Sequence, residues 1–315
     1  MEKIAVLIPC YNEELTVEKV IKDFRKELPN ADIYVYDNNS TDKTAELAQK
    51  AGAILRRENR QGKGNVVRTM FKEIEADIYI MVDGDDTYPA EFVHKLIEPV
   101  RSGEVDMCIG DRLTNGTYQA QIKKNFHEFG NNLVRKTINF LFKNKLKDIM
   151  TGYRVFTREF VKNMPVLSPK FEVETEMTLY ALDRKWRIKE IPIEFRERPD
   201  GSESKIDTVG DGIKVIKTII RMFKDYKPRK FFFTISLILA LVGILIGIPV
   251  IVEFAQTGFI TKIPSAILAT GIMIFSLITA QCGVILDTIV KQHHEDYETQ
   301  LLRYTQIENL RKLEK

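Results

Sequence analysis

The sequence predicts an α/β fold built on a doubly wound, mostly parallel sheet. Short apolar segments alternate with amphipathic helical patterns at the spacing of βαβ units, which favours parallel strands covered by helices. Strands are expected at residues 4–8, 33–36, 54–57 and 78–82. The first, second and fourth run into polar or acidic loops, at the sheet edge where parallel α/β proteins bind their ligands.

Composition narrows the class of protein. The chain has 315 residues, 44% hydrophobic and 29% charged, which is enough for one sizeable core and an appendage. A net charge of +3 is too small to indicate a nucleic-acid partner. Cys10, Cys108 and Cys282 are odd in number and far apart, which argues against a disulfide framework and fits a reducing cytosol. With four histidines in the whole chain, a zinc site is not expected.

The first helices are predicted from caps and apolar stripes. Asn12 is a candidate N-cap for a helix with a buried stripe at helical spacing. That stripe consists of Val17, Val20, Ile21, Phe24 and Leu28. The polar run 37–42 after the second strand is expected to cap a helix that ends near Gly52. Residues 60–64, which include Lys63 between two glycines, precede the next helix.

Three carboxylates follow the fourth strand. Asp83, Asp85 and Asp86 come directly after residues 78–82, and Pro89 opens the next helix. Such acids repel one another unless a hard cation such as Mg²⁺ or Mn²⁺ neutralises them, and these ions usually bind substrate phosphates as well. A solvated acidic turn is the alternative. Neither a Gly-x-Gly-x-x-Gly nor a P-loop motif is present in the chain, so a nucleotide would be held in another way.

The polar segments further along the chain are expected to form an acceptor half. A strand at 107–112 ends on Arg112, and Lys124 lies in the first turn of a helix at 121–142. A further helix and strand are expected at 171–186 and 188–195. The loop 196–205 combines a glycine, serines and flanking cations, which suits a phosphate monoester, although an exposed basic linker is the alternative.

The C-terminal third predicts membrane attachment. A helix at 206–228 places an apolar stripe beside a basic one, as in helices at an anionic membrane surface, and packing in a core is its alternative. The apolar stripe is Val209, Ile213, Ile216, Ile220 and Phe223, and the basic one is Lys214, Lys217, Arg221 and Lys224. Residues 231–252 and 263–286 carry no charge, and each exceeds the ~20 residues that cross a bilayer. They predict two transmembrane helices joined by a hairpin.

The charges that flank these spans predict their orientation. Basic residues gather before the first span and Lys291 follows the second, whereas Lys262 alone lies between them. By the positive-inside rule, both termini and the α/β domain are expected in the cytoplasm. A charged helix is expected at 291–315, and the spans with this tail favour a homo-oligomer. The expected parts are a catalytic domain at 1–205, the amphipathic helix at 206–228, the two spans within 229–290 and the tail at 291–315.

The three polar loops resemble those of the family 2 glycosyltransferases with the GT-A fold. The resemblance implies that the first loop and the first acid of the second hold the base and ribose of a nucleotide sugar, and that Lys63 lies near its diphosphate. The implied donor-binding residues are Pro9, Tyr11, Asn12, Glu13, Asp37, Asn39, Lys63, Asp83 and Gly84. Asp83 and Asp85 are implied to hold the Mg²⁺ or Mn²⁺ ion.

With the loop 198–205 and the C-terminal third included, the chain resembles the polyprenyl-phosphate glycosyltransferases, the relatives of dolichol-phosphate mannose synthase. This resemblance implies transfer of a sugar from a UDP- or GDP-sugar to undecaprenyl or dolichyl phosphate at the cytoplasmic face. The implied acceptor-phosphate residues are Lys124, Arg198, Ser202, Ser204 and Lys205, and the implied catalytic residues are Asp85, Arg112 and Asp148, with Arg154 beside the sugar. The chain departs from the relatives at Thr87, where glutamine is frequent, and at Lys124, where arginine is common.

The mechanism follows from the acceptor. A phosphate monoester is anionic at neutral pH and is its own nucleophile, so positioning and charge carry the reaction. One displacement would invert the anomeric centre and give a β-linked product from an α-linked donor. A processive polysaccharide synthase is one alternative, but it would need a Gln-x-x-Arg-Trp motif and more spans. A non-catalytic, membrane-anchored subunit that binds nucleotide sugars is the other.

Overall fold

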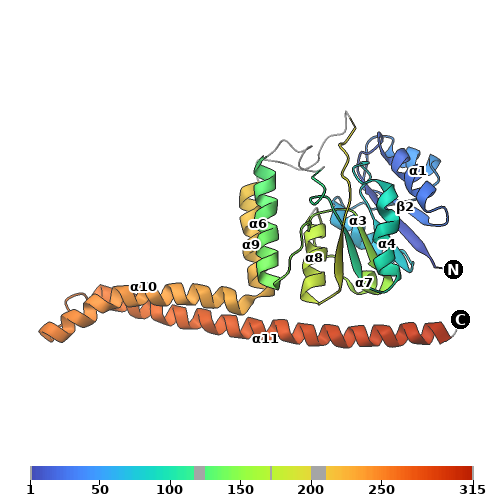
Figure 1. Ribbon diagram of the computed structural model, residues 1–315. Helices are drawn as coiled ribbons and strands as arrows, with labels where there is room; N and C mark the ends of the chain where they lie inside the picture. Colours follow the sequence, from blue (N-terminus) through green and yellow to red (C-terminus); the bar gives the residue numbers. More distant parts are fainter. Residues whose placement is uncertain (1, 117–124, 171, 200–210, 314–315) are drawn as a thin grey trace. The chain divides into compact units, whose positions relative to one another are not determined.

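The computed structural model describes residues 2–116, 125–170, 172–199 and 211–313, with side chains except at 125–129, 131, 211–218 and 311–313. The chain forms two compact units, Met1–Asp211 and Gly212–Lys315 (Figure 1). The finer division into four parts stays a prediction, and its first boundary, after residue 205, lies outside the described residues.

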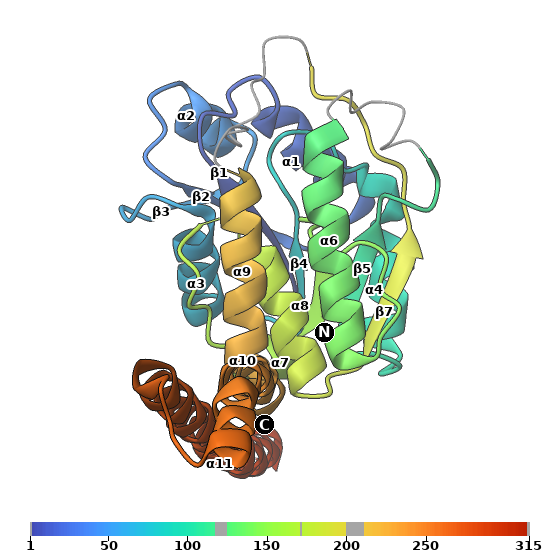
Figure 2. The same cartoon turned by 90° about the vertical axis from the view of Figure 1, so that its left-hand side faces the viewer.

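A seven-stranded sheet forms the centre of the first unit (Figure 2). Its strands are β1 (Ile4–Cys10), β2 (Asp32–Asp37), β3 (Ile54–Arg57), β4 (Ile78–Met81), β5 (Met107–Asp111), β6 (Arg154–Thr157) and β7 (Ile188–Pro192). They lie in the order β3-β2-β1-β4-β6-β5-β7. Strand β6 is antiparallel to both of its neighbours, and every other pair is parallel. The predicted α/β fold with a mostly parallel sheet is confirmed.

Helices cover both faces of this sheet. They are α1 (Val17–Glu27), α2 (Thr44–Lys50), α3 (Lys63–Glu73), η1 (Ala90–Phe92), α4 (Val93–Arg101), α6 (Asn125–Phe142), α7 (Arg158–Asn163) and α8 (Val173–Asp183). Successive strand residues point to opposite faces, so Ile8 and Val82 join the apolar residues of α1 and α4. Leu7 and Met81 join those of α3, α7 and α8 on the other face. The two layers hold β1 and β4 rigidly, and the loops of interest follow these strands.

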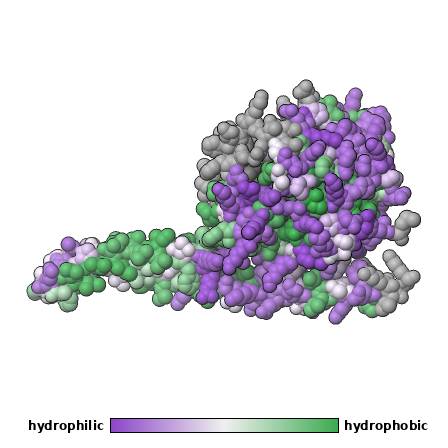
Figure 3. All heavy atoms as spheres, viewed as in Figure 1, coloured by the Kyte–Doolittle hydropathy of each residue, from purple (hydrophilic) through white to green (hydrophobic). Residues whose placement is uncertain are grey.

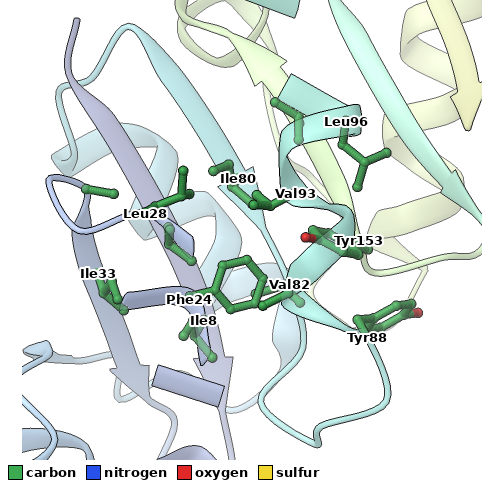
Figure 4. Close-up of a cluster of buried hydrophobic side chains, with 14 of the residues drawn as sticks. Ile8, Phe24, Leu28, Ile33, Ile80, Val82, Tyr88, Val93, Leu96 and Tyr153 are labelled. Atoms are coloured by element: carbon green, nitrogen blue, oxygen red, sulfur yellow. The ribbon is translucent and has the colours of Figure 1, made fainter. Parts of the chain in front are cut away.

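The cluster between the sheet and helices α1 and α4 is centred on Phe24. Figure 4 shows this ring among Ile8, Val82 and Tyr153, which come from different elements. The rings of Phe24 and Tyr153 meet edge to face, with centroids 5.9 Å apart. The whole predicted stripe of α1 is buried, as its helical spacing requires.

The predicted capping role of Asn12 is wrong. Helix α1 begins at Val17, with Thr16 as its N-cap residue. Asn12 instead has a φ of 53°, in the left-handed region that asparagine tolerates better than most residues. Its side-chain carbonyl accepts a hydrogen bond from the Thr41 N–H at 2.8 Å. Asn12 therefore ties the loop after β1 to the loop after β2.

The second unit consists mainly of two long apolar helices. Its helices are α9 (Asp211–Tyr226), α10 (Pro228–Thr257) and α11 (Ile263–Leu313). Helix α10 lies beside the first part of α11, and the hydroxyls of Ser236 and Ser276 hydrogen-bond between them at 3.1 Å. Both helices are long and apolar enough to cross a membrane. Their paired surface is largely hydrophobic in Figure 3, as a lipid-facing surface would be.

The C-terminal tail differs from the prediction in one respect. A separate helix was expected from Lys291, but α11 continues from the apolar segment into the charged tail without a break. Residues 284–313 contain neither glycine nor proline, so no backbone signal ends the helix there. In α9, the described side chains Arg221 and Lys224 of the predicted basic stripe are exposed.

Candidate active site

The loops after β1, β2 and β4 are tied together at the carboxyl edge of the sheet. The Glu13 N–H donates to Thr44 Oγ1 at 2.7 Å, which joins the first loop to the start of α2. The Thr16 hydroxyl donates to the Gly84 carbonyl at 2.6 Å and joins the first loop to the acidic loop. The structure thus brings together the three loops that were predicted to meet at the carboxyl ends of the strands.

The loop after β2 presents a buried carboxylate. Asp37 is 1% exposed, accepts a hydrogen bond from the Ser40 N–H at 3.2 Å, and lies 3.7 Å from Arg57 Nε. Pro9 lies opposite the preceding strand residue of β2, and Tyr11 is partly exposed beyond it. A carboxylate held in this way is suited to accept hydrogen bonds from ligand hydroxyls.

Asn38 is a structural residue of this edge that no sequence pattern marks. Its amide donates to the carbonyls of Glu58 at 2.8 Å and Arg60 at 2.9 Å, and its Oδ1 accepts the Gly62 N–H at 2.7 Å. The neighbouring Asn39, a predicted donor-binding residue, also bonds to this loop through its side chain. Asn38 therefore fixes the loop that leads to Lys63.

Two glycines allow the acidic loop to pack closely. A Cβ at Gly84 would lie 2.7 Å from Cys10 Sγ, so only glycine fits beside the end of β1. A Cβ at Gly152 would lie 2.4 Å from Asp83 Oδ2. The backbone at Gly152 therefore forms one wall around the Asp83 carboxylate.

Asp83 shares a cation with a second carboxylate. The Lys63 ammonium donates to Asp83 Oδ1 and to Glu174 Oε1. The side chains of Lys63 and Glu174 are both buried, whereas that of Asp83 is 25% exposed. Burial alone would lower the pKa of Lys63, but the two carboxylates raise it, so the ammonium stays charged at neutral pH.

Glu174 was not among the predicted site residues. It lies in the first turn of α8, where Glu172, Glu174 and Glu176 occur at alternate positions. Acids at a helix start usually indicate no more than a favourable helix dipole, so the pattern alone did not mark one of them. The contact with Lys63 spans 111 residues in sequence and becomes visible only in the fold.

Asp85 bonds to a residue that was assigned to the acceptor phosphate. The Arg198 guanidinium donates to Asp85 Oδ2. Asp85 Oδ1 accepts hydrogen bonds from the Thr87 hydroxyl at 2.6 Å and from the Thr87 N–H at 3.2 Å. Thr87 thus orients the carboxylate, and the expected metal residue and the expected acceptor residue are direct neighbours.

Arg112 and Asp148 form a two-pronged ion pair beside this edge. Arg112 Nε and one terminal nitrogen donate to the Asp148 oxygens at 2.7 and 2.9 Å. The guanidinium also lies 6.0 Å from the Tyr88 ring centre and 5.6 Å from that of Phe195. Burial would raise the pKa of Asp148, but Arg112 outweighs this and lowers it. The Glu190 carboxylate accepts a hydrogen bond from the Asp148 N–H at 2.7 Å, which fixes the backbone of Asp148.

Arg154 lies inside the protein rather than at the surface of the site. It is fully buried in β6 and donates to the carbonyls of Ile149 at 2.8 Å and Thr151 at 3.0 Å, and to the Thr178 hydroxyl at 2.9 Å. Burial lowers its pKa to about 10, which leaves it charged at neutral pH. The structure therefore gives Arg154 the role of ordering the segment between Asp148 and Gly152.

The remaining acceptor-phosphate predictions lie outside the described residues. They are Lys124, Ser202, Ser204 and Lys205.

The carboxylates at this edge fit a metal ion that arrives with a ligand. Within the described residues, no three His, Cys, Asp or Glu side chains are grouped so that they could hold a metal ion alone. Mg²⁺ is commonly bound by one or two carboxylates, with substrate phosphates and water as the other ligands. Asp83 and Asp85 match that donor set, and each also bonds to a side-chain cation.

A mostly parallel sheet with paired carboxylates at its carboxyl edge is the architecture of GT-A glycosyltransferases. The sequence model of the family described as Glycosyl transferase family 2 matches residues 5–164. Glycosyltransferase AglJ of Haloferax volcanii is 32% identical over 295 residues, which cover 93% of this chain and 96% of that protein. The chain belongs to glycosyl transferase family 2 and is a glycosyltransferase.

Other proteins share part of this likeness. The Dolichyl-phosphate hexose transferase of Haloferax volcanii is 28% identical over 228 residues, which cover 72% of this chain and 97% of that protein. Glucosyl-3-phosphoglycerate synthase of Mycobacterium tuberculosis, solved with Mn²⁺, UDP-glucose and phosphoglyceric acid, has a TM-score of 0.57 at 21% identity. That match covers 70% of this chain and 79% of the other, and it shows a shared fold.

Proposed function

We propose that this protein transfers a sugar from a UDP- or GDP-sugar to a polyprenyl phosphate at the cytoplasmic face of a membrane, with inversion at the anomeric carbon. The contact between Arg198 and Asp85 carries the proposal, because it puts a cation suited to an acceptor phosphate beside an acid suited to a donor metal. The relative named for dolichyl-phosphate hexose transfer supports a lipid acceptor. The two apolar helices would keep the enzyme at the membrane that contains this lipid.

The donor would bind across the three tied loops. Asp37 would accept hydrogen bonds from the ribose, and Lys63 would lie at the diphosphate. Asp83 and Asp85 would hold Mg²⁺ or Mn²⁺, which would supply positive charge to the leaving diphosphate. The buried surroundings of Asp85 strengthen every charge interaction there, since little water screens them.

The acceptor phosphate needs positive charge to approach an anionic donor. Arg198 bonds to Asp85, and it would exchange this carboxylate for the acceptor phosphate when a metal ion binds Asp85. Arg112 is fixed by Asp148 and two aromatic rings, which spares the entropic cost of ordering it during the reaction. The phosphate itself is the nucleophile, and no general base is required.

The membrane topology and the assembly are also part of the proposal. Both termini and the catalytic unit would lie in the cytoplasm, because basic residues precede the first apolar segment and Lys291 follows the second. The charged end of α11 would favour contacts between copies in a homo-oligomer. Crosslinking in membranes that yields monomer alone would contradict the oligomer.

Replacing Gly152 by alanine is expected to slow transfer about a hundredfold without unfolding the protein. The new Cβ would lie 2.4 Å from Asp83 Oδ2, so the carboxylate must move away from its position. The transfer rate and the thermal unfolding midpoint are the two measurements. An unchanged rate would show that the position of Asp83 is unimportant.

The proposed reaction is tested by incubating membranes that contain the protein with a panel of radiolabelled UDP- and GDP-sugars, Mn²⁺ and added polyprenyl phosphate. Label from one donor should enter organic-extractable lipid. Membranes without the protein provide the background. If no donor labels lipid but one is hydrolysed or bound, the acceptor assignment is wrong. Binding without hydrolysis would support a non-catalytic binding subunit.

A further inference from the structure

Glu174 is buried beside the donor edge and is only partly satisfied. Its carboxylate is 7% exposed, and Oε1 accepts a hydrogen bond from the Lys63 ammonium. Oε2 is buried and has no hydrogen-bond partner within the described residues. A buried carboxylate oxygen without a partner costs folding free energy. Stability therefore does not explain the presence of a carboxylate at this place.

The backbone around Lys63 is seated firmly against the segment that leads into α8. A Cβ at Gly62 would lie 2.2 Å from the Pro169 carbonyl oxygen, and one at Gly64 would lie 1.8 Å from that of Ser168. These contacts fix the start of α3 relative to the segment before Glu174. The backbone of Lys63 is thus held close to the segment that carries Glu174.

The charges in this group do not balance. One ammonium faces two carboxylates. Because Lys63 divides its hydrogen bonds, Asp83 keeps part of its negative charge available for another cation. Asp83 is also the most exposed member of the group, so a metal ion can reach it from solvent.

We propose that Glu174 is a positioning residue for donor binding. Glu174 holds the Lys63 ammonium in place when Asp83 binds a divalent cation together with the donor diphosphate. This inference rests on the proposed function. Without Glu174, a divalent cation at Asp83 would leave the buried Lys63 ammonium without a carboxylate partner and next to a second positive charge. Glu174 would also keep that ammonium where the diphosphate binds.

A purely structural role makes a different prediction. If Glu174 only joins α3 to α8, its loss should lower the unfolding temperature and leave ligand affinity alone. Asp106 offers a matched control, because its carboxylate is 9% exposed and paired with Arg187 at 2.7 Å. It precedes β5, at the opposite end of that strand from the active-site edge.

The test is a binding measurement on the full-length protein in detergent. Free Mn²⁺ is followed by electron paramagnetic resonance during titration in the presence of UDP or of GDP. Glu174→Gln should weaken Mn²⁺ binding with the nucleotide at least tenfold, on the order of one charged hydrogen bond. Glu174→Asp should recover part of the affinity, and Asp106→Asn should retain it despite a lower unfolding temperature.

A double-mutant cycle shows whether Glu174 acts through Lys63. In a Lys63→Met background, adding Glu174→Gln should change the Mn²⁺ affinity less than about twofold, because the residue it positions is gone. Wild-type affinity in Glu174→Gln, or an equal loss in both backgrounds, would overturn the inference. Wild-type protein that binds Mn²⁺ with neither nucleotide would instead contradict the proposed function.

Discussion

Replacing Asp85 by asparagine is expected to lower the rate of sugar transfer about a thousandfold with little change in stability. Asparagine can keep the hydrogen bond from the Thr87 hydroxyl, which is 2.6 Å long in the wild type, so the loop should retain its shape. It cannot supply the negative charge that binds a metal ion on the donor diphosphate. Steady-state transfer of labelled sugar into lipid measures the loss.

Asp86 provides the control for this substitution. It is the next residue, and its carboxylate bonds to Lys19 at 2.7 Å instead of to a proposed active-site cation. Its φ of 58° lies in the left-handed region, which asparagine tolerates. Asp86→Asn should therefore lower the rate less than about tenfold, in line with a partly exposed ion pair. Equal losses in the two variants would argue against a specific role for Asp85.

Replacing Arg198 by glutamine is expected to lower transfer about a hundredfold or more, while binding of Mn²⁺ with nucleotide does not weaken. The side chain bonds to Asp85, so its removal frees that carboxylate for the metal ion. The acceptor phosphate, in contrast, loses one of its proposed cations. Parallel measurements of transfer and of Mn²⁺ binding separate these two effects.

Arg196 is the matched control for Arg198. It lies two residues earlier in the same segment and pairs with Glu91 at 3.0 Å. Arg196→Gln should leave both transfer and Mn²⁺ binding close to wild type. If Arg198→Gln weakens Mn²⁺ binding as strongly as it slows transfer, Arg198 belongs to the donor site and its assignment to the acceptor is wrong.

The features predicted well from sequence are those with a local pattern. Apolar runs such as residues 78–82 mark buried strands by themselves, and the acids that follow them must then lie at the carboxyl edge. The apolar stripe of α1 and the two long apolar helices are likewise periodic or continuous along the chain. The fold class therefore follows from properties that neighbouring residues share.

The features that were missed depend on partners far apart in sequence. Arg198 and Asp85 are separated by 113 positions, and only the fold brings them together. Lys63 was predicted near a diphosphate, but its contact with Glu174 gives no local signal. Asparagine is a common helix cap, but the Asn12 side chain accepts a hydrogen bond from the Thr41 N–H instead of capping α1. The residues around either member of such an ion pair give no sign of its distant partner, so the pair cannot be predicted from local sequence.

The acceptor assignment is tested most directly with purified full-length protein and two lipids of equal chain length, a polyprenyl phosphate and the matching polyprenol. The same labelled nucleotide sugar and Mn²⁺ are supplied to both. We predict sugar transfer to the phosphate alone, with a β-linked sugar phosphate as the product. Transfer to the polyprenol at a similar rate, or to neither lipid while a soluble acceptor is labelled, would contradict the proposed function.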